Sequence, residues 1–295
     1  MVIKNCRLCP RKCGAYRDET TGNGRCGASG VMKAARIAAH FGEEPCISGK
    51  NGSGAVFFSN CVMSCVFCQN YKISHGGFGT ELTPKELSQK FKMLEQSGVH
   101  NINLVSGTQY IPQIRESLLI YKPKIPVIFN CGGYERKESL SLLSGLVDVY
   151  LPDFKYSDDK MALEYSDAPH YRETAISAVS EMLRQTGAPS FDENGMIQRG
   201  TIIRHLVLPF GVKNSTEVLT LIKNNFGNEA LISLMAQYTP CGRAADHKRL
   251  NRKITKREYQ RVLDVLFELE LDGYAQELEA AGTEFIPAFD LTGLD

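Results

Sequence analysis

From residue 55 onward, short apolar runs alternate with longer stretches of helical periodicity, and this alternation limits the folds open to the chain. Six of the runs are rich in β-branched or aromatic residues, as is typical of strands that are covered on both faces. They span 55–60, 101–105, 126–130, 147–151, 201–208 and 230–236. Strands that alternate with helices build parallel βα units. The sequence therefore predicts an α/β fold, a partial (β/α)6 TIM-like barrel.

The segments between these strands carry helix signals. Thr83 suits a helix cap, Pro84 suits the first helical position, Glu86 completes a capping box and Gly98 closes the pattern. Apolar residues at helical spacing predict the other helices at 111–121, 135–144, 169–186, 214–225 and 255–272. The stretch 187–199 is the clearest irregular connection, and we expect it to be a surface loop.

Composition limits the function classes. The 295 residues, 43% of them hydrophobic, suffice for one sizeable α/β domain with an extension. The 34 Lys and Arg residues nearly balance 33 Asp and Glu residues, so the charge excess of a nucleic-acid-binding protein is missing. No secretion signal and no run of about 18 apolar residues is present. We expect a cytoplasmic protein without nucleic acid or membrane as partner.

The distribution of cysteines suggests the domain organisation. Eight of the ten cysteines precede residue 70. We predict a Cys-rich amino-terminal extension at 1–50, the barrel at 51–281 and a carboxyl-terminal tail at 282–295 that packs on the barrel.

Three cysteines follow the first predicted strand with CxxxCxxC spacing: Cys61, Cys65 and Cys68. In a chain without an export signal, cysteines should be reduced, and their clustering favours metal binding over disulfides. A cubane iron–sulfur cluster takes cysteine thiolates on its irons, so three cysteines leave one iron free to bind a reactant. The alternative is a zinc site with these three ligands and a fourth from elsewhere, either Cys46 or Cys131.

This spacing resembles the signature of the radical S-adenosylmethionine (radical SAM) family. The resemblance implies a [4Fe–4S] cluster whose open iron binds the amino acid end of S-adenosylmethionine. It also implies that one electron from the cluster releases methionine and a 5′-deoxyadenosyl radical, which removes hydrogen from a substrate. A one-electron reductant such as flavodoxin or ferredoxin is then an implied partner.

Barrel enzymes build their sites at the carboxyl ends of the strands, so the residues after each predicted strand are candidates. Ser106, Gly107 and Thr108 stand where radical SAM relatives carry a GGEP-like turn that meets the amino group of the cofactor, although this chain has no Glu there. Asn130 and Gly132 resemble a cofactor segment of glycyl-radical activating enzymes, which often begins with Asp. The neutral Asn130 argues against the bound monovalent cation of some relatives, and Gly132 also suits an ordinary strand-to-helix turn.

The last three predicted strands add further candidates. Asp153 and Lys155 resemble the DxK element of the activating enzymes, with a surface ion pair as the alternative. Either Arg204 or His205 must face inward. Arg204 suits the cofactor carboxylate, because a guanidinium binds it through two parallel hydrogen bonds, whereas a histidine in an apolar strand is often a core residue. Gln237 follows the sixth strand and would reach the adenine or the substrate.

A second set of cysteines lies in the amino-terminal extension, with C-x2-C-x3-C-x12-C spacing: Cys6, Cys9, Cys13 and Cys26. The surrounding sequence is rich in Gly, Arg and Lys and has little to bury, whereas a bound metal supplies folding free energy to a short segment. We favour an auxiliary zinc ion or iron–sulfur cluster over free thiols. The spacing does not choose between the two metals.

Longer motifs resemble one branch of the radical SAM proteins, the branch related to pyruvate formate-lyase activating enzyme. They are CxLCPRxC at the start, HFGEEPxISG before the barrel, CVFCQNYxIS at the cysteine triplet and RHLVLP in the fifth strand. Those activating enzymes take hydrogen from a glycine of a partner protein. The resemblance implies an oxidoreductase that acts on a polypeptide.

Two other hypotheses stay open. One is the same radical chemistry on a small metabolite, and the other is a non-catalytic iron–sulfur protein for electron transfer. The basic stretch 243–257 follows the sixth strand and would dock an acidic protein surface or a phosphorylated metabolite, although a solvated loop is the simpler interpretation.

Overall fold

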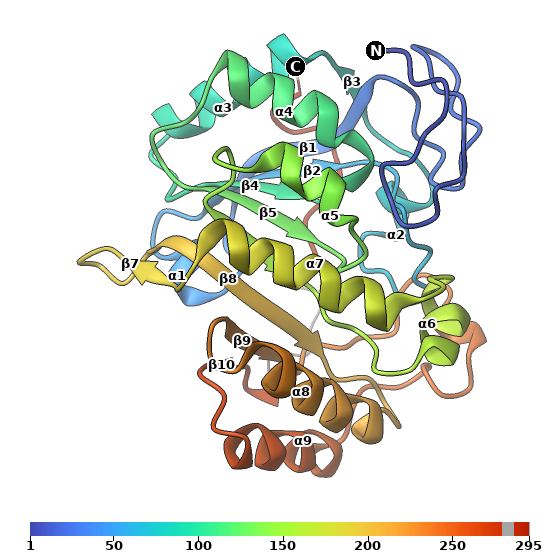
Figure 1. Cartoon of the computed structure of the whole chain (residues 1–295), viewed down its shortest axis with the longest axis vertical. Helices are drawn as coiled ribbons and strands as arrows, with labels where there is room; N and C mark the ends of the chain where they lie inside the picture. The colour runs from blue at the N-terminus through green and yellow to red at the C-terminus, as the bar shows by residue number, and fades with distance from the viewer. Residues whose placement is uncertain (279–285, 295) are drawn as a thin grey trace.

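The structure is a computed structural model that describes residues 1–278 and 286–294 (Figure 1). The described residues form a ten-stranded sheet with the order β10-β9-β8-β6-β5-β4-β2-β1-β3, and β7 pairs with β8. The parallel strands are β2 (Ser53–Phe58), β4 (Ile102–Val105), β5 (Val127–Cys131), β6 (Val149–Pro152), β8 (Ile197–Leu206), β9 (Leu231–Met235) and β10 (Gly273–Ala275). The antiparallel strands are β1 (Met32–His40), β3 (Thr80–Leu82) and β7 (Ser190–Phe191). The α/β fold with a parallel sheet is confirmed.

Helices connect the parallel strands. They are α3 (Pro84–Gln96), α4 (Ile111–Ile120), α5 (Lys137–Leu140), α6 (Asp159–Ser166), α7 (Tyr171–Thr186), α8 (Val212–Phe226) and α9 (Lys256–Glu268). Two four-residue helices, α1 (Pro45–Ser48) and α2 (Tyr71–Ser74), flank β2. Capping boxes at Thr83 and Thr255 begin α3 and α9, because each threonine and the glutamate three residues later satisfy otherwise unpaired backbone N–H groups.

Several elements differ from the sequence-based expectation. The stretch 187–199, expected as an irregular loop, contains β7 and the start of β8, which form a hairpin. Gly195 has a φ of 75° and makes the turn of this hairpin. The short elements α1, α2, α6, β1, β3 and β10 were also not predicted.

The two faces of the parallel strands pack differently. One face lies against α3, α4 and α7 to α9 in two large apolar clusters. On the other face, Ile128, Val149 and Ile202 surround Cys46 and Ile47 of α1. Because these strand residues lie toward the amino-terminal ends, the segment around α1 fills that end of the interior and leaves the carboxyl ends of the strands for polar groups.

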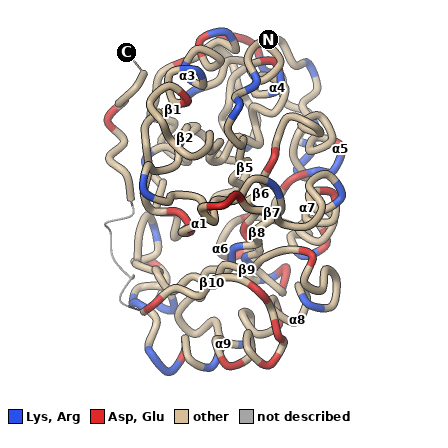
Figure 2. Tube along the Cα trace, turned by 90° about the vertical axis from the view of Figure 1, so that its left-hand side faces the viewer, with Lys and Arg blue, Asp and Glu red and all other residues tan. Residues whose placement is uncertain are grey.

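The two ends of the chain extend the sheet and cover it. β1 belongs to the segment that we assigned to the amino-terminal extension, and it pairs with β2 over six registered positions. At the other end, Leu291 N donates to Ala35 O at 3.1 Å and Ile37 N donates to Thr292 O at 2.9 Å. Figure 2 shows the carboxyl-terminal residues along this edge of the molecule. Positions 282–285 and 295 of the predicted tail lie outside the described residues.

Among the residues described, no helix combines the length and the apolar character needed to cross a membrane.

Candidate functional site

The predicted cysteine triplet forms a loop between β2 and α2, at the carboxyl ends of the strands. Cys61, Cys65 and Cys68 are half-buried and line one cavity. Each sulfur has a hydrogen-bond donor beside it: Met63 N lies 3.4 Å from Cys61 Sγ, Ser166 Oγ lies 2.9 Å from Cys65 Sγ and Ser74 Oγ lies 3.3 Å from Cys68 Sγ. The loop thus presents three sulfurs, with donors that favour their thiolate form.

The electrostatics of this loop favour a positively charged occupant. Burial and the neighbouring thiols raise the pKa of Cys61, and the same two causes raise the pKa of Cys68 to about 11. Burial also raises the pKa of Cys65, although the Lys155 ammonium acts in the opposite direction. A thiol binds a metal as the thiolate, so binding here would release the thiol protons to solvent. Three such thiols on one wall fit a metal centre with thiolate ligands.

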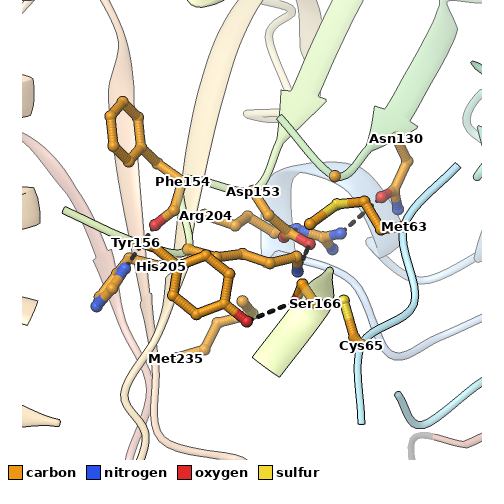
Figure 3. A network of polar contacts seen from close by, with 12 residues as sticks. Met63, Cys65, Asn130, Asp153, Phe154, Tyr156, Ser166, Arg204, His205 and Met235 are labelled. Carbon is orange, nitrogen blue, oxygen red and sulfur yellow. Dashed lines mark hydrogen bonds and ion pairs between the residues drawn. The ribbon is translucent and has the colours of Figure 1, made fainter. Parts of the chain in front are cut away.

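Facing the cysteines, an ion-pair network forms the floor of the cavity (Figure 3). Arg204 is its hub. Its Nε lies 3.2 Å from Asp153 Oδ1, its Nη1 lies 2.9 Å from Glu43 Oε2 and its Nη2 lies 2.6 Å from Asn130 Oδ1. Lys155 Nζ pairs with the other oxygen of Asp153. Side chains from β5, from β8, from the loop after β6 and from the segment before α1 therefore meet at one point.

The charges in this network stabilise one another. Burial alone would raise the pKa of Asp153, but Lys155 and Arg204 outweigh it and hold the pKa below its usual value. Burial would likewise lower the pKa of Lys155, and Asp153 and Cys65 reverse that effect. Both groups stay ionised at neutral pH. The floor of the cavity therefore presents fixed charges of both signs.

Arg204 and His205, which are adjacent in β8, face opposite sides of the sheet. Arg204 points into the cavity, whereas His205 is fully buried against α8. His205 Nδ1 lies 2.6 Å from the Phe154 carbonyl oxygen, so it must donate, and Nε2 then accepts from Ser215 Oγ at 2.8 Å. Burial lowers the pKa of His205 to about 4, and the ring is neutral. His205 is a satisfied core residue.

The structure brings most of the predicted cofactor residues into the same cavity as the cysteines. Those that line it are Ser106, Thr108, Asn130, Gly132, Asp153, Lys155, Arg204 and Gln237. Gly107 is the exception among them. A side chain there would meet Ile114 Cδ1 at 2.6 Å and Phe58 at 3.2 Å, so this position faces the helix side of the sheet. The contact of the Gly107 backbone with the cofactor therefore stays a prediction.

Sequence reasoning missed Glu135 as a candidate site residue. Glu135 is 1% exposed and lines the cavity. Its Oε1 accepts a hydrogen bond from Thr108 Oγ1 at 2.8 Å, whereas its Oε2 has no partner among the described residues. Burial raises the pKa of Glu135 to about 7, against the lowering effect of the Thr108 hydroxyl. An unsatisfied buried carboxylate oxygen costs free energy unless a ligand donates to it.

Glu43 was also missed, because nothing in the local sequence relates it to β8. Its Oε1 accepts from Asn103 Nδ2 at 2.9 Å and from Asn130 Nδ2 at 3.2 Å, while Oε2 binds Arg204. The only available signal was the pair of adjacent acidic residues in the HFGEEP motif. Residues before the barrel therefore complete the floor of the site.

The alternative of a single zinc ion rested on a fourth cysteine. Cys46 lies in α1 within the apolar cluster at the far end of the interior. Cys131 lines the cavity and lies beside Glu135. Within 1–278 and 286–294, no three or more His, Cys, Asp or Glu side chains converge as a single metal ion requires. A cubane spreads its thiolate ligands over several irons, so its cysteines need not converge on one point.

The amino-terminal cysteines are neighbours of one another. Burial is the main cause that raises the pKa of Cys9 to about 11. The nearby thiols of Cys26, Cys13 and Cys6 each raise this pKa further. The guanidinium of the buried Arg17 lies 3.7 Å from Cys6 Sγ. The four thiols thus lie near one another, although within 1–278 and 286–294 they do not converge as a single metal ion requires, and a metal in the extension stays a prediction.

Side-chain contacts hold the extension against the cysteine loop. Arg11 Nε donates to the Val62 carbonyl oxygen at 2.7 Å, and Arg25 Nε donates to Asp167 Oδ2 at 2.7 Å. Arg136 Nη1 and Ser139 Oγ bind the carbonyl oxygens of residues 7 and 8. The extension therefore packs beside the loop that carries the site.

Comparison with known proteins agrees with this arrangement. Residues 55–194 match the family model described as the Radical SAM superfamily. An uncharacterized protein of Methanocaldococcus jannaschii is 30% identical over 281 residues, which cover 92% of this chain and 77% of that protein.

Two solved structures share the fold at low sequence identity. A radical SAM methyltransferase from Sphaerobacter thermophilus aligns with a TM-score of 0.50 and 12% identity, over 74% of this chain and 66% of that one. Streptococcus suis SuiB bound to S-adenosylmethionine aligns with a TM-score of 0.50 and 13% identity, over 73% of this chain and 47% of that one. This chain thus spans just under two thirds of the first protein and about half of the second.

Proposed function

The chain belongs to the radical SAM superfamily, and from this premise we propose that Cys61, Cys65 and Cys68 hold its [4Fe–4S] cluster beside a site for S-adenosylmethionine. The observation that carries the proposal is the shared cavity. Three thiols line it together with the charged residues at the carboxyl ends of β5, β6 and β8.

The residues present fit both cofactors. The thiols have raised pKa values and adjacent donors, so a cluster of cationic irons would stabilise their thiolate form. The amino acid end of S-adenosylmethionine carries an ammonium and a carboxylate, and the cavity offers charges of both signs. When bound, the two cofactors supply a 5′-deoxyadenosyl radical that removes a hydrogen atom from the substrate.

Glu135 is the residue that we assign to the ammonium group of the cofactor. Relatives carry a glutamate in the turn after the second strand of the barrel, and this chain has Ser106, Gly107 and Thr108 there. Thr108 instead holds one oxygen of Glu135 at 2.8 Å, and the other oxygen has no hydrogen-bond partner in the described part of the chain. A buried carboxylate in this position accepts a charge-assisted hydrogen bond from an ammonium.

Arg204 and Lys155 are the cations available to the cofactor carboxylate. Three of the five N–H donors of Arg204 already bind Asp153, Glu43 and Asn130, which leaves two for a ligand. The guanidinium between Asp153 and Asn130 also supplies a fixed positive charge, so we propose no bound monovalent cation there. Ser106, Gly132 and Gln237 line the remaining wall, where the adenosine and the substrate would lie.

For the substrate, we propose a polypeptide with an acidic surface. The segment after β9 packs on the cysteine loop, where Arg243 N donates to the Val66 carbonyl oxygen at 2.7 Å. Arg243, Lys248 and Arg249 of this segment are exposed. A basic rim beside the cavity supports docking of an acidic protein. The likeness to pyruvate formate-lyase activating enzymes in the sequence motifs points to the same class of substrate.

In the extension, we propose that Cys6, Cys9, Cys13 and Cys26 bind an auxiliary metal, either zinc or an iron–sulfur cluster. Support comes from the mutual proximity of the four thiols and from the scarcity of regular structure in residues 1–31. Metal analysis of a variant that lacks Cys61, Cys65 and Cys68 tests this proposal directly. Retained zinc or iron is expected, and metal-free protein would contradict it.

The catalytic proposal is tested with anaerobically reconstituted protein. With dithionite and S-adenosylmethionine, we expect release of 5′-deoxyadenosine, detected by liquid chromatography. Spectroscopy that finds only tetrahedral zinc at Cys61, Cys65 and Cys68 would overturn it.

The substrate class needs a separate experiment with proteins of the source cell. A glycine-centred radical signal or a mass change on a peptide is the expected result. Turnover of a metabolite fraction, with no change in any protein, would favour the small-molecule alternative.

A further inference from the structure

The carboxyl end of α6 is anchored on the cysteine loop by backbone hydrogen bonds. Ser64 N donates to the Ser166 carbonyl oxygen at 3.0 Å, and Val66 N donates to the Tyr165 carbonyl oxygen at 2.9 Å. Asp167 ends the helix in a left-handed conformation, with a φ of 47°. These contacts hold Ser166 in register with Cys65, which lies between the two donating residues.

In this register, the Ser166 side chain links Cys65 to a buried tyrosine. Ser166 Oγ lies 2.9 Å from Cys65 Sγ and 2.6 Å from Tyr156 Oη (Figure 3). Ser166 and Tyr156 are both 0% exposed. The Tyr156 ring packs edge-on against Tyr171, with 5.3 Å between ring centroids. The Ser166 hydroxyl is therefore shielded from solvent and lies between Cys65 Sγ and Tyr156 Oη.

Hydrogen-bond chemistry sets the direction of this chain. A thiolate can only accept, so Ser166 must donate its single hydroxyl proton to a deprotonated Cys65. Tyr156 must then donate to Ser166 Oγ. Burial, with the nearby Cys65 as the next cause, raises the pKa of Tyr156 well above its usual value, so the phenol keeps the proton it donates. Consecutive hydrogen bonds that point the same way polarise one another.

We propose that Tyr156 and Ser166 are positioning residues that raise the reduction potential of the iron–sulfur cluster by donating, in series, to the Cys65 thiolate. This inference rests on the proposed role of Cys61, Cys65 and Cys68 as cluster ligands. Reduction adds negative charge to the cluster and its thiolates, and a hydrogen bond to a ligand sulfur stabilises that charge. Neither residue touches the reacting atoms.

The three thiolates are not equivalent in this respect. The donor to Cys65 is the nearest of the three, at 2.9 Å, and a second hydroxyl supports it. The donors to Cys61 and Cys68 lie at 3.4 and 3.3 Å. Loss of the Ser166 hydroxyl should therefore change the potential more than loss of the Ser74 hydroxyl.

A potentiometric titration of the anaerobic, cluster-loaded protein, monitored by electron paramagnetic resonance, tests the inference. In Ser166→Ala, we expect the equilibrium constant for reduction to fall about 3- to 10-fold, equivalent to a potential about 30–60 mV more negative at 59 mV per tenfold for one electron. Tyr156→Phe should shift it in the same direction by less, because Ser166 still donates to Cys65.

Controls separate a local effect from a general one. Ser180→Ala removes an exposed helical serine whose hydroxyl binds the Ile176 carbonyl oxygen of its own helix, and it should leave the potential unchanged. Iron and sulfide content must equal that of the wild type in each variant compared. If Ser166→Ala does not fold or hold the cluster, Tyr156→Phe decides, because it removes one oxygen atom and keeps the ring.

The outcomes distinguish this inference from the function on which it rests. Wild-type protein that assembles no cluster at Cys61, Cys65 and Cys68 overturns the proposed function. A normal cluster whose potential is unchanged, or is raised, in both Ser166→Ala and Tyr156→Phe overturns the hydroxyl relay and leaves the proposed function intact.

Discussion

The two cysteine-bearing regions of this chain use the same residue type in different settings. The loop of Cys61, Cys65 and Cys68 is held by backbone hydrogen bonds to α6 and follows a strand buried in the sheet. The set of Cys6, Cys9, Cys13 and Cys26 lies in irregular chain and is attached to the loop and helices by arginine and serine side chains. The first region is preorganised by the fold, whereas the second depends on its own contacts and on any metal it binds.

The largest expected difference between the regions is catalytic. Cys65→Ala removes a cluster ligand, so we expect 5′-deoxyadenosine formation to fall to background. Cys13→Ala removes an exposed thiol of the other set, and we expect activity to stay within about tenfold of the wild type. Chromatography of anaerobic reaction mixtures measures both. Complete loss in Cys13→Ala, with the cluster of the loop intact, would show that the two regions function as one.

The next difference is in stability. Asp153→Asn leaves Lys155 and Arg204 without their shared counter-charge, in a network whose three side chains are each at most 17% exposed. We expect a loss of about 3–5 kcal/mol in the free energy of unfolding, the usual cost of breaking a buried ion pair. Denaturant unfolding of the cluster-loaded protein measures it. A loss below 1 kcal/mol would mean that solvent reaches this network.

A smaller change in the free energy of unfolding, this time an increase, is expected when Glu135 is replaced by Gln. Its pKa in the folded protein is about 7, above the ordinary 4.5, so the stability linked to its protonation is present below pH 4.5 and lost as the pH rises through 7. At 1.36 kcal/mol per pKa unit, this loss reaches at most about 3.4 kcal/mol. Glu135→Gln should therefore be more stable than the wild type at pH 8 and equally stable near pH 4.5.

Thermal unfolding without S-adenosylmethionine, at both pH values, checks this prediction. Glu138→Gln is the matched control, because its carboxylate side chain is 57% exposed and forms only a surface ion pair with Arg136. Its stability should differ from that of the wild type by less than about 0.5 kcal/mol at either pH. A Glu135→Gln variant less stable than the wild type at pH 8 would contradict the assignment of an unsatisfied buried carboxyl.

The smallest expected effect concerns the attachment of the extension. Asp167→Asn makes the same chemical change as Asp153→Asn but at a side chain that is 40% exposed, where it pairs with the half-exposed Arg25 and, at 3.4 Å, with Arg11. Surface ion pairs contribute about 0–1 kcal/mol, and asparagine tolerates the left-handed backbone of this position. Denaturant unfolding should show a loss below about 1 kcal/mol. A loss as large as that of Asp153→Asn would mean that the extension is integral to the barrel.

Sequence reasoning succeeded where local pattern and chemistry coincide. The strands around Asn130 and Arg204 were predicted from runs rich in β-branched residues. Because barrel sites form at the carboxyl ends of strands, the polar residues there were predicted to line one site. Alternation along β8 required one of Arg204 and His205 to face inward. The capping pattern at Thr83 likewise specified a helix start that the structure contains.

The missed residues share a different property. Glu43 meets Arg204 across 161 positions of sequence, and Ser166 meets Cys65 across 101 positions. Neither contact can be recognised from the neighbouring residues in the sequence. The first depends on the path of the segment between β1 and α1, the second depends on the position of α6, and neither was predicted. Gly107 stays a predicted cofactor residue, although a side chain at its position would meet Phe58 and Ile114.

By itself, the sequence determined the alternating α/β architecture, the three-thiol loop and the set of polar residues at the strand ends. These features follow from periodicity and side-chain chemistry, which act over a few residues. Only the tertiary structure decided which polar groups pair, namely Arg204 with Glu43, Thr108 with Glu135 and Ser166 with Cys65. Such pairings depend on distances of a few ångströms between distant segments, and only the packed fold sets those distances.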